Sequence, residues 1–235
     1  RNNDMKKVLL SLAMLSVIST PVLAKAPVAN LKINGDIKPP TCTINGATQS
    51  DMIFDYRVIS PTLIPQSKNY EYPNGIVQNT VTIECDAKTY LTFVASDTYD
   101  SAELANNTLA QFHLVDKENP ETAVGAASFL WEDVTVDSKP AYISRANDVT
   151  ITETNYYNVL YKGATNGWTS EQQKGNVSKE SLALIPGEVF QAVFKDVYKI
   201  PSFLLSKDAL NKKGIDLSNG LDFMGEAVLT FNFGV

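Results

Sequence analysis

The stretch TVTIEC, residues 80–85, alternates apolar and polar side chains: Val81, Ile83 and Cys85 share one face and the residues between them share the other. LTFVA, residues 91–95, repeats the same period after the polar segment Asp86 to Lys88. A period of two is typical of a strand with one buried face. The sequence therefore predicts a strand, a short turn at residues 86–88, and a second strand.

Similar alternation continues along the chain, and helical spacing is sustained only from Ser206 to Lys213. Turn-forming residues separate the apolar runs at Lys117–Glu121, Asn166-Gly167 and Asn211–Gly220. Many short strands with turns between them indicate an all-β sandwich or barrel in one domain. The further strands expected are Leu109–Val115, Ser128–Val136, Asp148–Glu153, Tyr156–Lys162, Val189–Ile200 and Glu226–Phe233.

Residues 5–24, MKKVLLSLAMLSVISTPVLA, combine two lysines, a short apolar run and small residues ahead of a cleavage point after Ala24. This arrangement is typical of a secretory signal peptide, and it is too short for a membrane span. We expect residues 1–24, which include the leader remnant RNND, to lie outside the fold. The predicted domain is then 25–235, with an N-terminal extension at 25–36, and the protein is not expected to span a membrane.

The charge balance narrows the classes of partner. The chain has 20 Lys and Arg against 26 Asp and Glu, a formal net charge of −6. Binding to phosphate backbones depends on clustered cations that release counterions. No nucleic-acid partner is expected.

The chain has two cysteines, Cys42 and Cys85. Export to an oxidising compartment favours a disulfide between them, and closing that loop would contribute about 4 kcal/mol in the chain-entropy model. Two buried free thiols are the alternative. A zinc site is not expected, because the chain has one histidine and no CxxC motif.

The sequence contains no recognisable catalytic site. The only histidine, His113, lies in an alternating run where a solvent-facing position is expected, and no GxSxG, HExxH, P-loop or GxGxxG motif occurs. Glu132 and Asp133 beside Trp131 could suggest a glycosidase, but neighbouring strand residues point to opposite faces. We therefore predict no enzyme, no cofactor and no metal.

Two other groups of residues have an ordinary structural interpretation. Asp208 to Asp222 contains acids and a glycine but does not match a calcium-binding loop, so a solvated loop is expected. Trp168 and the pair Tyr156-Tyr157 could stack on a sugar or a partner. Packing in the core or at its rim is the favoured interpretation, because aromatic residues are common in strands.

The two ends of the predicted domain carry strand patterns that the rest of the fold does not explain. Pro27, Ala29, Leu31 and Ile33 share one face of a half-buried strand, which Gly35 and the pair Pro39-Pro40 interrupt before Cys42. The last strand places Ala227, Leu229, Phe231 and Phe233 on one face. At a sheet border these apolar side chains and free backbone groups would form an exposed edge, which a partner strand would cover.

Taken in order, four stretches of the chain resemble the pilin-like subunits exported through chaperone-usher pathways, and more closely their larger periplasmic or fimbrial-like relatives. The resemblance covers both ends of the predicted domain and extends only loosely over about residues 100 to 185. The four stretches are Leu31–Ile37 before Cys42, Phe54–Pro61, Thr80–Cys85 and Gly225–Phe233.

The resemblance implies an immunoglobulin-like sandwich that lacks one strand. A periplasmic chaperone and then the N-terminal extension of a neighbouring pilus subunit would fill the vacancy, after export through the periplasm and passage through an outer-membrane usher to a fimbrium on the cell surface. By analogy, Pro27, Ala29, Leu31 and Ile33 would be donor-strand residues. Leu229, Phe231 and Phe233 would form the accepting edge, and the Cys42–Cys85 bridge would tie the first strand to the second.

Two alternatives belong to other functional classes. A self-contained periplasmic binding protein could use the same sandwich to hold a sugar or a peptide, with the extra length of the chain supplying the completing strand. An enzyme built on a sandwich is the third possibility.

Overall fold

The computed structural model describes residues 28–73, 75, 77–152, 156–196 and 200–234. The chain divides into two units, Arg1–Lys38 and Pro39–Val235. Residues 28–38 of the first unit are exposed and form neither helix nor strand, so the half-buried strand expected around Leu31 and Ile33 is absent from the isolated chain. Pro27 and the predicted signal peptide, 1–24, lie outside the described residues.

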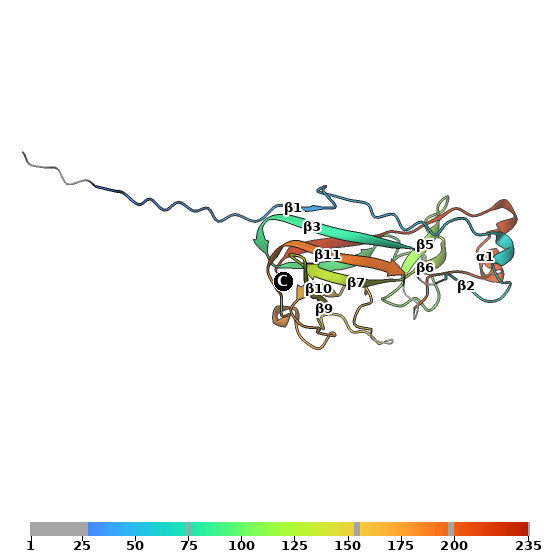
Figure 1. Ribbon diagram of the computed structural model, residues 1–235. Helices are drawn as coiled ribbons and strands as arrows, with labels where there is room; N and C mark the ends of the chain where they lie inside the picture. Colours follow the sequence, from blue (N-terminus) through green and yellow to red (C-terminus); the bar gives the residue numbers. More distant parts are fainter. Residues whose placement is uncertain (1–27, 74, 76, 153–155, 197–199, 235) are drawn as a thin grey trace, which may run out of the picture. The chain divides into compact units, whose positions relative to one another are not determined.

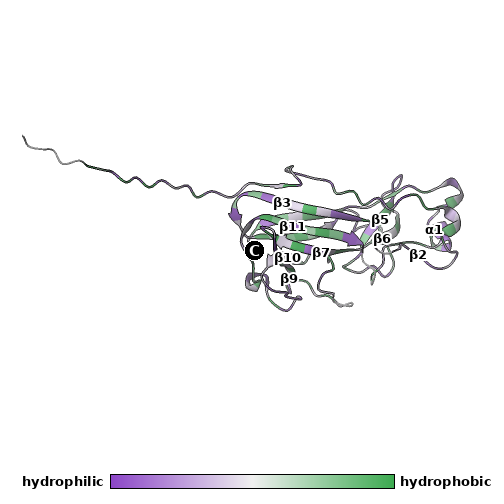
Figure 2. Cartoon of the chain, viewed as in Figure 1, coloured by the Kyte–Doolittle hydropathy of each residue, from purple (hydrophilic) through white to green (hydrophobic). Residues whose placement is uncertain are grey.

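The first sheet of the Pro39–Val235 unit is antiparallel, and three long strands form its centre. Figure 1 shows β3, β11 and β7 side by side, and apolar and polar bands alternate along them in Figure 2. The ladder between β3 and β11 runs from Thr89 opposite Gly187 to Gln78 opposite Lys195. The sheet order is β1 (Cys42–Ile44), β3 (Gln78–Thr89), β11 (Gly187–Asp196), β7 (Phe129–Val136) and β8 (Lys139–Pro140).

Two further antiparallel sheets complete this unit. The second sheet has the order β14 (Ala227–Phe233), β4 (Leu91–Asp97), β10 (Thr165–Thr169) and β9 (Tyr142–Arg145). The third sheet has the order β13 (Phe223–Met224), β5 (Phe112–Asp116), β6 (Ala123–Ala127), β12 (Phe203–Leu204) and β2 (Tyr70–Glu71).

The first and second sheets enclose the main core. Phe93 of β4 is fully buried, and its ring packs against Trp131 of the first sheet, Trp168 of the second, and two phenylalanines, Phe194 and Phe231. Burying side chains of this size supplies most of the favourable free energy of such a sandwich. The predicted all-β sandwich class is confirmed.

The third sheet has a core of its own, which includes Leu114, Val124 and Leu204. Helix α1 (Lys207–Lys212) covers part of it with Leu210, and Figure 1 shows α1 and β2 at the end of this unit that lies away from β1. The helical spacing expected from Ser206 to Lys213 corresponds to α1, and Ser206 caps this helix by accepting a hydrogen bond from the Ala209 N–H. The remaining short helices are η1 (Pro61–Leu63), η2 (Lys179–Ser181) and η3 (Leu217–Asn219).

The turn expected at residues 86–88 is wrong, because β3 continues through these residues to Thr89. The Asp86 N–H donates to the Thr41 carbonyl, and the Asp86 carboxylate accepts from the Thr41 N–H. The chain then turns at Tyr90 and enters the second sheet, so β3 and β4 lie in opposite layers. The polar residues beyond Cys85 predict a turn from the sequence alone, but in the structure they form the exposed end of a long strand.

The turn expected at Asn166-Gly167 is also wrong, because both residues lie inside β10 and are buried. A Cβ atom on Gly167 would lie 2.5 Å from Leu184 Cδ2 and 3.0 Å from Thr92 Cγ2. The glycine is therefore needed for close packing, not for a turn.

The strands expected at Leu109–Val115, Ser128–Val136, Val189–Ile200 and Glu226–Phe233 are confirmed, with shifted ends, as β5, β7, β11 and β14. The strands expected between β9 and β10 are wrong. Residues 148–152 and 156–162 form no strand, apart from isolated bridges at Val159 and Lys162. Strand β6, with the sequence AVGAA, was missed because it is buried on both faces and so shows no alternation.

Candidate functional site: an apolar groove between β1 and β14

The predicted disulfide between Cys42 and Cys85 is formed. It joins β1 to β3 at the position where the two cysteines lie opposite each other in the ladder. β1 is only three residues long and ends the order of the first sheet. The bridge therefore holds a short edge strand in place where few backbone hydrogen bonds could.

At the other side, β14 ends the order of the second sheet and is hydrogen-bonded to β4 along all seven of its residues. The predicted edge residues Leu229 and Phe231 are only half-buried, and Phe233 is 50% exposed. Leu229 and Phe231 pack against the main core. Among the described strands, none pairs with the outer edge of β14.

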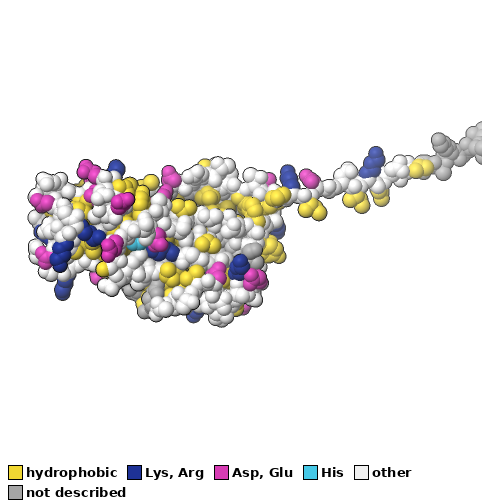
Figure 3. All heavy atoms as spheres, turned by 180° about the vertical axis from the view of Figure 1, so that it is seen from behind, with side chains coloured by type: hydrophobic (Ala, Val, Ile, Leu, Met, Phe, Trp, Pro, Cys, Tyr) yellow, Lys and Arg dark blue, Asp and Glu magenta, His cyan; other side chains and the backbone are white. Residues whose placement is uncertain are grey.

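A groove with a volume of about 1420 Å³ is lined by these two edge strands. Ile44 of β1 lies on one side, and Leu229 and Phe231 of β14 lie on the other. Figure 3 shows apolar side chains gathered in patches over this unit, on the face turned away in Figure 1. The groove is further lined by buried core residues, among them Ile83, Leu91, Phe112, Phe129, Leu160 and Phe194.

Residues 48–58 form the remaining wall without joining a sheet. Asn79 of β3 holds this segment by donating its side-chain N–H to the Ile53 carbonyl over 2.7 Å. Ile53 itself is 74% exposed. The ring of Phe54 also packs on Phe129 of β7, with 5.0 Å between the ring centroids, so the wall attaches to the first sheet through polar and apolar contacts while Ile53 stays exposed.

The groove combines two features that an extended peptide can use. Seven residues of strand offer an edge about 23 Å long, with backbone donors and acceptors pointing outward. The inward-facing side chains alternate along β14 and leave apolar space above the core. A strand added here would hydrogen-bond to β14 and insert every second side chain into the groove.

One end of the groove is polar. His113 of β5 lines it and is buried, so the expectation of a solvent-facing histidine is wrong. Its Nδ1 lies 2.6 Å from Asp97 Oδ2, and its backbone N–H donates to the same oxygen over 2.8 Å. Lys162 Nζ lies 3.6 Å from that Asp97 oxygen and 2.5 Å from Asp100 Oδ1. The imidazole is buried because a carboxylate partner is buried with it.

Burial disfavours the charged form of Asp97, but hydrogen bonds from the His113 ring, the His113 N–H and the Tyr99 N–H outweigh it and lower the pKa of this carboxyl. Asp97, Asp100 and His113 each offer a ligand atom, and these atoms lie within 4.8 Å of one another. The Lys162 ammonium already supplies positive charge to both carboxylates. The cluster is therefore a satisfied ion-pair network that joins β4 to β5.

The other residues singled out from the sequence do not converge on a site. Trp131 is buried, while Glu132 pairs with Lys195 over 2.6 Å on the surface. Trp168 is buried in the core, as the favoured interpretation predicted. The solvated loop expected at Asp208–Asp222 contains the end of α1 and the short helix η3, and Asp216 accepts hydrogen bonds there from the N–H and hydroxyl of Ser218.

The donor-strand residues and the accepting edge fall in different units. Ala29, Leu31 and Ile33 belong to the Arg1–Lys38 unit, whereas Leu229, Phe231 and Phe233 belong to Pro39–Val235. The core residues that line the groove were missed as site residues, because their alternation marks them only as buried.

No protein-family model, curated protein or solved structure matches this chain. Among the described residues, no helix has the length and apolar character needed to cross a bilayer.

Proposed function

We propose that this protein is an exported fimbrial-like subunit, structural or adhesive, whose sandwich is completed by a strand from another chain. The observation that carries the proposal is the groove between the edge strands β1 and β14, lined by the main core. A periplasmic pilus chaperone would fill it first. The outer-membrane usher would then exchange the chaperone for a neighbouring subunit, and the assembled protein would lie in a fimbrium at the cell surface.

The donor would be the extension at 25–36 of that neighbouring subunit. Its apolar side chains at Pro27, Ala29, Leu31 and Ile33 have the spacing of every second residue that a strand lying along β14 requires. Leu31 and Ile33 are 96% and 98% exposed in the isolated chain. Burying them against Leu229 and Phe231 would remove apolar surface from both partners.

The fold we propose at this finer level is an immunoglobulin-like sandwich lacking one strand. Two features support it: β1 is tied to β3 by Cys42–Cys85, and the last strand, β14, ends the order of the opposite sheet. A contact in which one subunit donates a strand and accepts another is head-to-tail. Such contacts build filaments.

A synthetic peptide of residues 25–36 tests strand acceptance directly. At a concentration one hundred times its Kd, a ligand of the folded state adds about 2.7 kcal/mol of stability. For a chain of this size that corresponds to a rise in Tm of roughly 5–10 °C. Differential scanning calorimetry of the purified chain with the peptide measures it, and a peptide with Leu31 and Ile33 replaced by Asp is the control. Equal effects of the two peptides would defeat the proposal.

Deleting residues 25–34 separates accepting from donating. The truncated chain should still bind a co-expressed pilus chaperone, because its groove is intact, but it should not form fibres. Size-exclusion chromatography and electron microscopy provide the two measurements. Loss of the monomeric fold on this deletion would instead show that the segment completes its own chain.

A self-contained periplasmic protein that binds a sugar or a peptide is the second candidate. The observation that favours it is a separate tyrosine-lined cavity, described below. Under this function the isolated chain is monomeric, unfolds cooperatively without a chaperone, and gains no stability from the 25–36 peptide. We propose no enzymatic role.

A further inference from the structure

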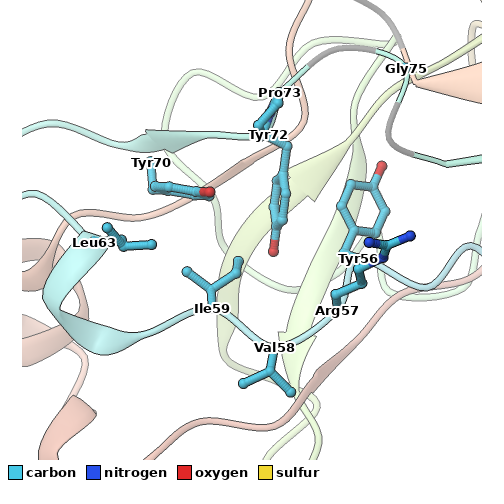
Figure 4. Close-up of a pocket in the computed structure, with 9 residues that line it drawn as sticks. All are labelled: Tyr56, Arg57, Val58, Ile59, Leu63, Tyr70, Tyr72, Pro73 and Gly75. Atoms are coloured by element: carbon cyan, nitrogen blue, oxygen red, sulfur yellow. The ribbon is translucent and has the colours of Figure 1, made fainter.

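A second cavity, of about 440 Å³, lies beside β2 and is lined by three tyrosines, Tyr56, Tyr70 and Tyr72. Figure 4 shows the rings of Tyr70 and Tyr56 on either side of Tyr72. Cavities of this volume suit a single small molecule. The lining residues are Tyr56, Arg57, Val58, Ile59, Leu63, Tyr70, Tyr72, Pro73 and Gly75.

The three rings are held in fixed and nearly perpendicular positions. The Tyr72 ring lies 4.4 Å from that of Tyr56 at 65° and 5.3 Å from that of Tyr70 at 83°, measured between centroids. Ser202 anchors two of them: its hydroxyl bonds the Tyr56 hydroxyl over 2.9 Å, and its carbonyl accepts from the Tyr72 N–H over 2.9 Å. Ser202 thus holds the Tyr56 hydroxyl and the Tyr72 backbone beside each other.

Two polar groups of the cavity are not used by the fold. The Tyr72 hydroxyl is buried and has no hydrogen-bond partner among the described residues, and Figure 4 shows it directed toward Ile59. A buried hydroxyl left without a partner destabilises the folded chain, and a ligand oxygen that accepted its hydrogen bond would remove that cost. Burial raises the pKa of Tyr72, with smaller effects from Tyr56 and Tyr70, so the group stays a hydrogen-bond donor at physiological pH.

The second unused group is the Arg57 guanidinium, which forms no ion pair or side-chain hydrogen bond within the described part of the chain. Its backbone has a φ of 60°, a left-handed conformation, and its N–H donates to Asp55 Oδ1 over 2.8 Å. An arginine fork left unpaired beside aromatic rings is suited to a carboxylate.

The tyrosine rings, the Tyr72 hydroxyl and the Arg57 guanidinium together favour one chemical class of ligand. Aromatic rings alone could attract a quaternary ammonium, but Arg57 lines the same cavity and would repel a cation. Ring faces accept the apolar C–H face of a pyranose, while the free hydroxyl and guanidinium donate to oxygen atoms. We propose that this cavity binds a pyranose sugar that carries a carboxylate, with Arg57 on the carboxylate and Tyr72 on a ring substituent.

The sugar site is independent of strand acceptance. Residues Tyr56 to Val58 border both cavities. The groove is otherwise lined by β1 and β14, whereas the sugar site is otherwise lined by residues near η1, by β2 and by the chain that follows β2. A chain that accepts no donor peptide would still bind the sugar. A chain that binds no sugar would still accept the peptide.

Calorimetric titration of the full chain with glucuronic acid tests the proposal, with glucose as the neutral match and acetate as the bare carboxylate. Glucuronic acid should bind at least tenfold more tightly than glucose or acetate, because a charge-assisted bidentate contact is added to the ring contact. Equal affinity for glucuronic acid and glucose would overturn the proposal. So would preferential binding of choline, or of a proline-rich peptide that uses the tyrosines as a groove.

Two variants assign the contacts. Arg57→Gln should reduce the preference for glucuronic acid over glucose to less than threefold, whereas Lys68→Gln, which removes an exposed charge outside the cavity, should leave it unchanged. Tyr72→Phe should raise Tm, because it removes an unpaired buried hydroxyl, and weaken glucuronic acid binding about fivefold or more. A rise in Tm without any loss of affinity would show that the hydroxyl does not contact the sugar, and would contradict the proposal.

Discussion

β4 and β14 are neighbours in the second sheet, pair residue by residue, and carry the same alternation, yet their inward faces differ in burial. Phe93 of β4 is fully buried, while Phe231 directly opposite it is only half-buried. Leu91 is 1% exposed, and its partner Phe233 is 50% exposed. The difference arises because β4 has a neighbour on each side and β14 has one.

The difference shows that apolar burial is incomplete along β14, at the border of the second sheet. The apolar side chains Leu229 and Phe231 of β14 pack against the main core and also line the groove, so part of their surface stays uncovered. Each square ångström left in water is worth about 25 cal/mol. A partner that covers the groove gains this free energy without having to form the core.

Replacing each of the two opposed phenylalanines by alanine tests most directly whether they contribute differently to stability. Phe93→Ala should cost about 3–5 kcal/mol of unfolding free energy, because it empties a site packed on all sides. Phe231→Ala should cost about 2 kcal/mol or less in the isolated chain. Urea unfolding measures both values.

Adding the 25–36 peptide should then bring the two costs together, because Phe231 becomes buried when the groove is filled. The outward-facing variant Val228→Ala should be insensitive to the peptide. If Phe231→Ala is already as costly as Phe93→Ala without peptide, the edge is closed and the comparison fails.

The contrast also explains how far the sequence could predict this structure. Alternation identified β3, β4 and β14 and the all-β class, since it depends only on which face of a strand is buried. It could not distinguish Phe93 from Phe231, because the number of neighbours of a strand is set by sheet order. Alternation also placed His113 in solvent, whereas its ring is buried. That burial depends on Asp97 and Lys162, which are distant from His113 in the sequence.

The next prediction concerns the ion-pair network of Asp97, His113 and Lys162 at the polar end of the groove. The pKa of Asp97 is lowered in the folded protein, so its carboxylate adds stability above the unfolded pKa of about 3.9, and this stability is lost as the pH falls through the folded pKa. Asp97→Asn should cost about 2–3 kcal/mol at pH 7, because it leaves Lys162 and His113 without their buried partner.

The same substitution should remove part of the acid dependence. Unfolding free energies measured in urea from pH 7 to pH 2 should fall less steeply for Asp97→Asn than for the wild type. Asp133→Asn, at an exposed carboxylate of β7, is the matched control. Parallel pH profiles for Asp97→Asn and the wild type would mean that β4 is not joined to β5 through an ionised Asp97.

The smallest predicted effect concerns the wall opposite β14, where Tyr56 lines the groove. Burial raises the pKa of Tyr56 to about 12, partly offset by its hydrogen bond with Ser202 and reinforced by the charge of Asp196. The folded protein therefore keeps a proton that the unfolded chain releases near pH 10, and stability falls as the pH rises from about 10 to 12. Tyr56→Phe should unfold with a shallower alkaline dependence, by about 1–2 kcal/mol over this range, while Tyr90→Phe, at an exposed tyrosine, should match the wild type. Guanidinium unfolding at pH 9, 10.5 and 11.5 provides the measurement.

A wild-type profile as shallow as that of Tyr56→Phe would place Tyr56 in solvent and leave the groove with β1 as its only wall facing β14.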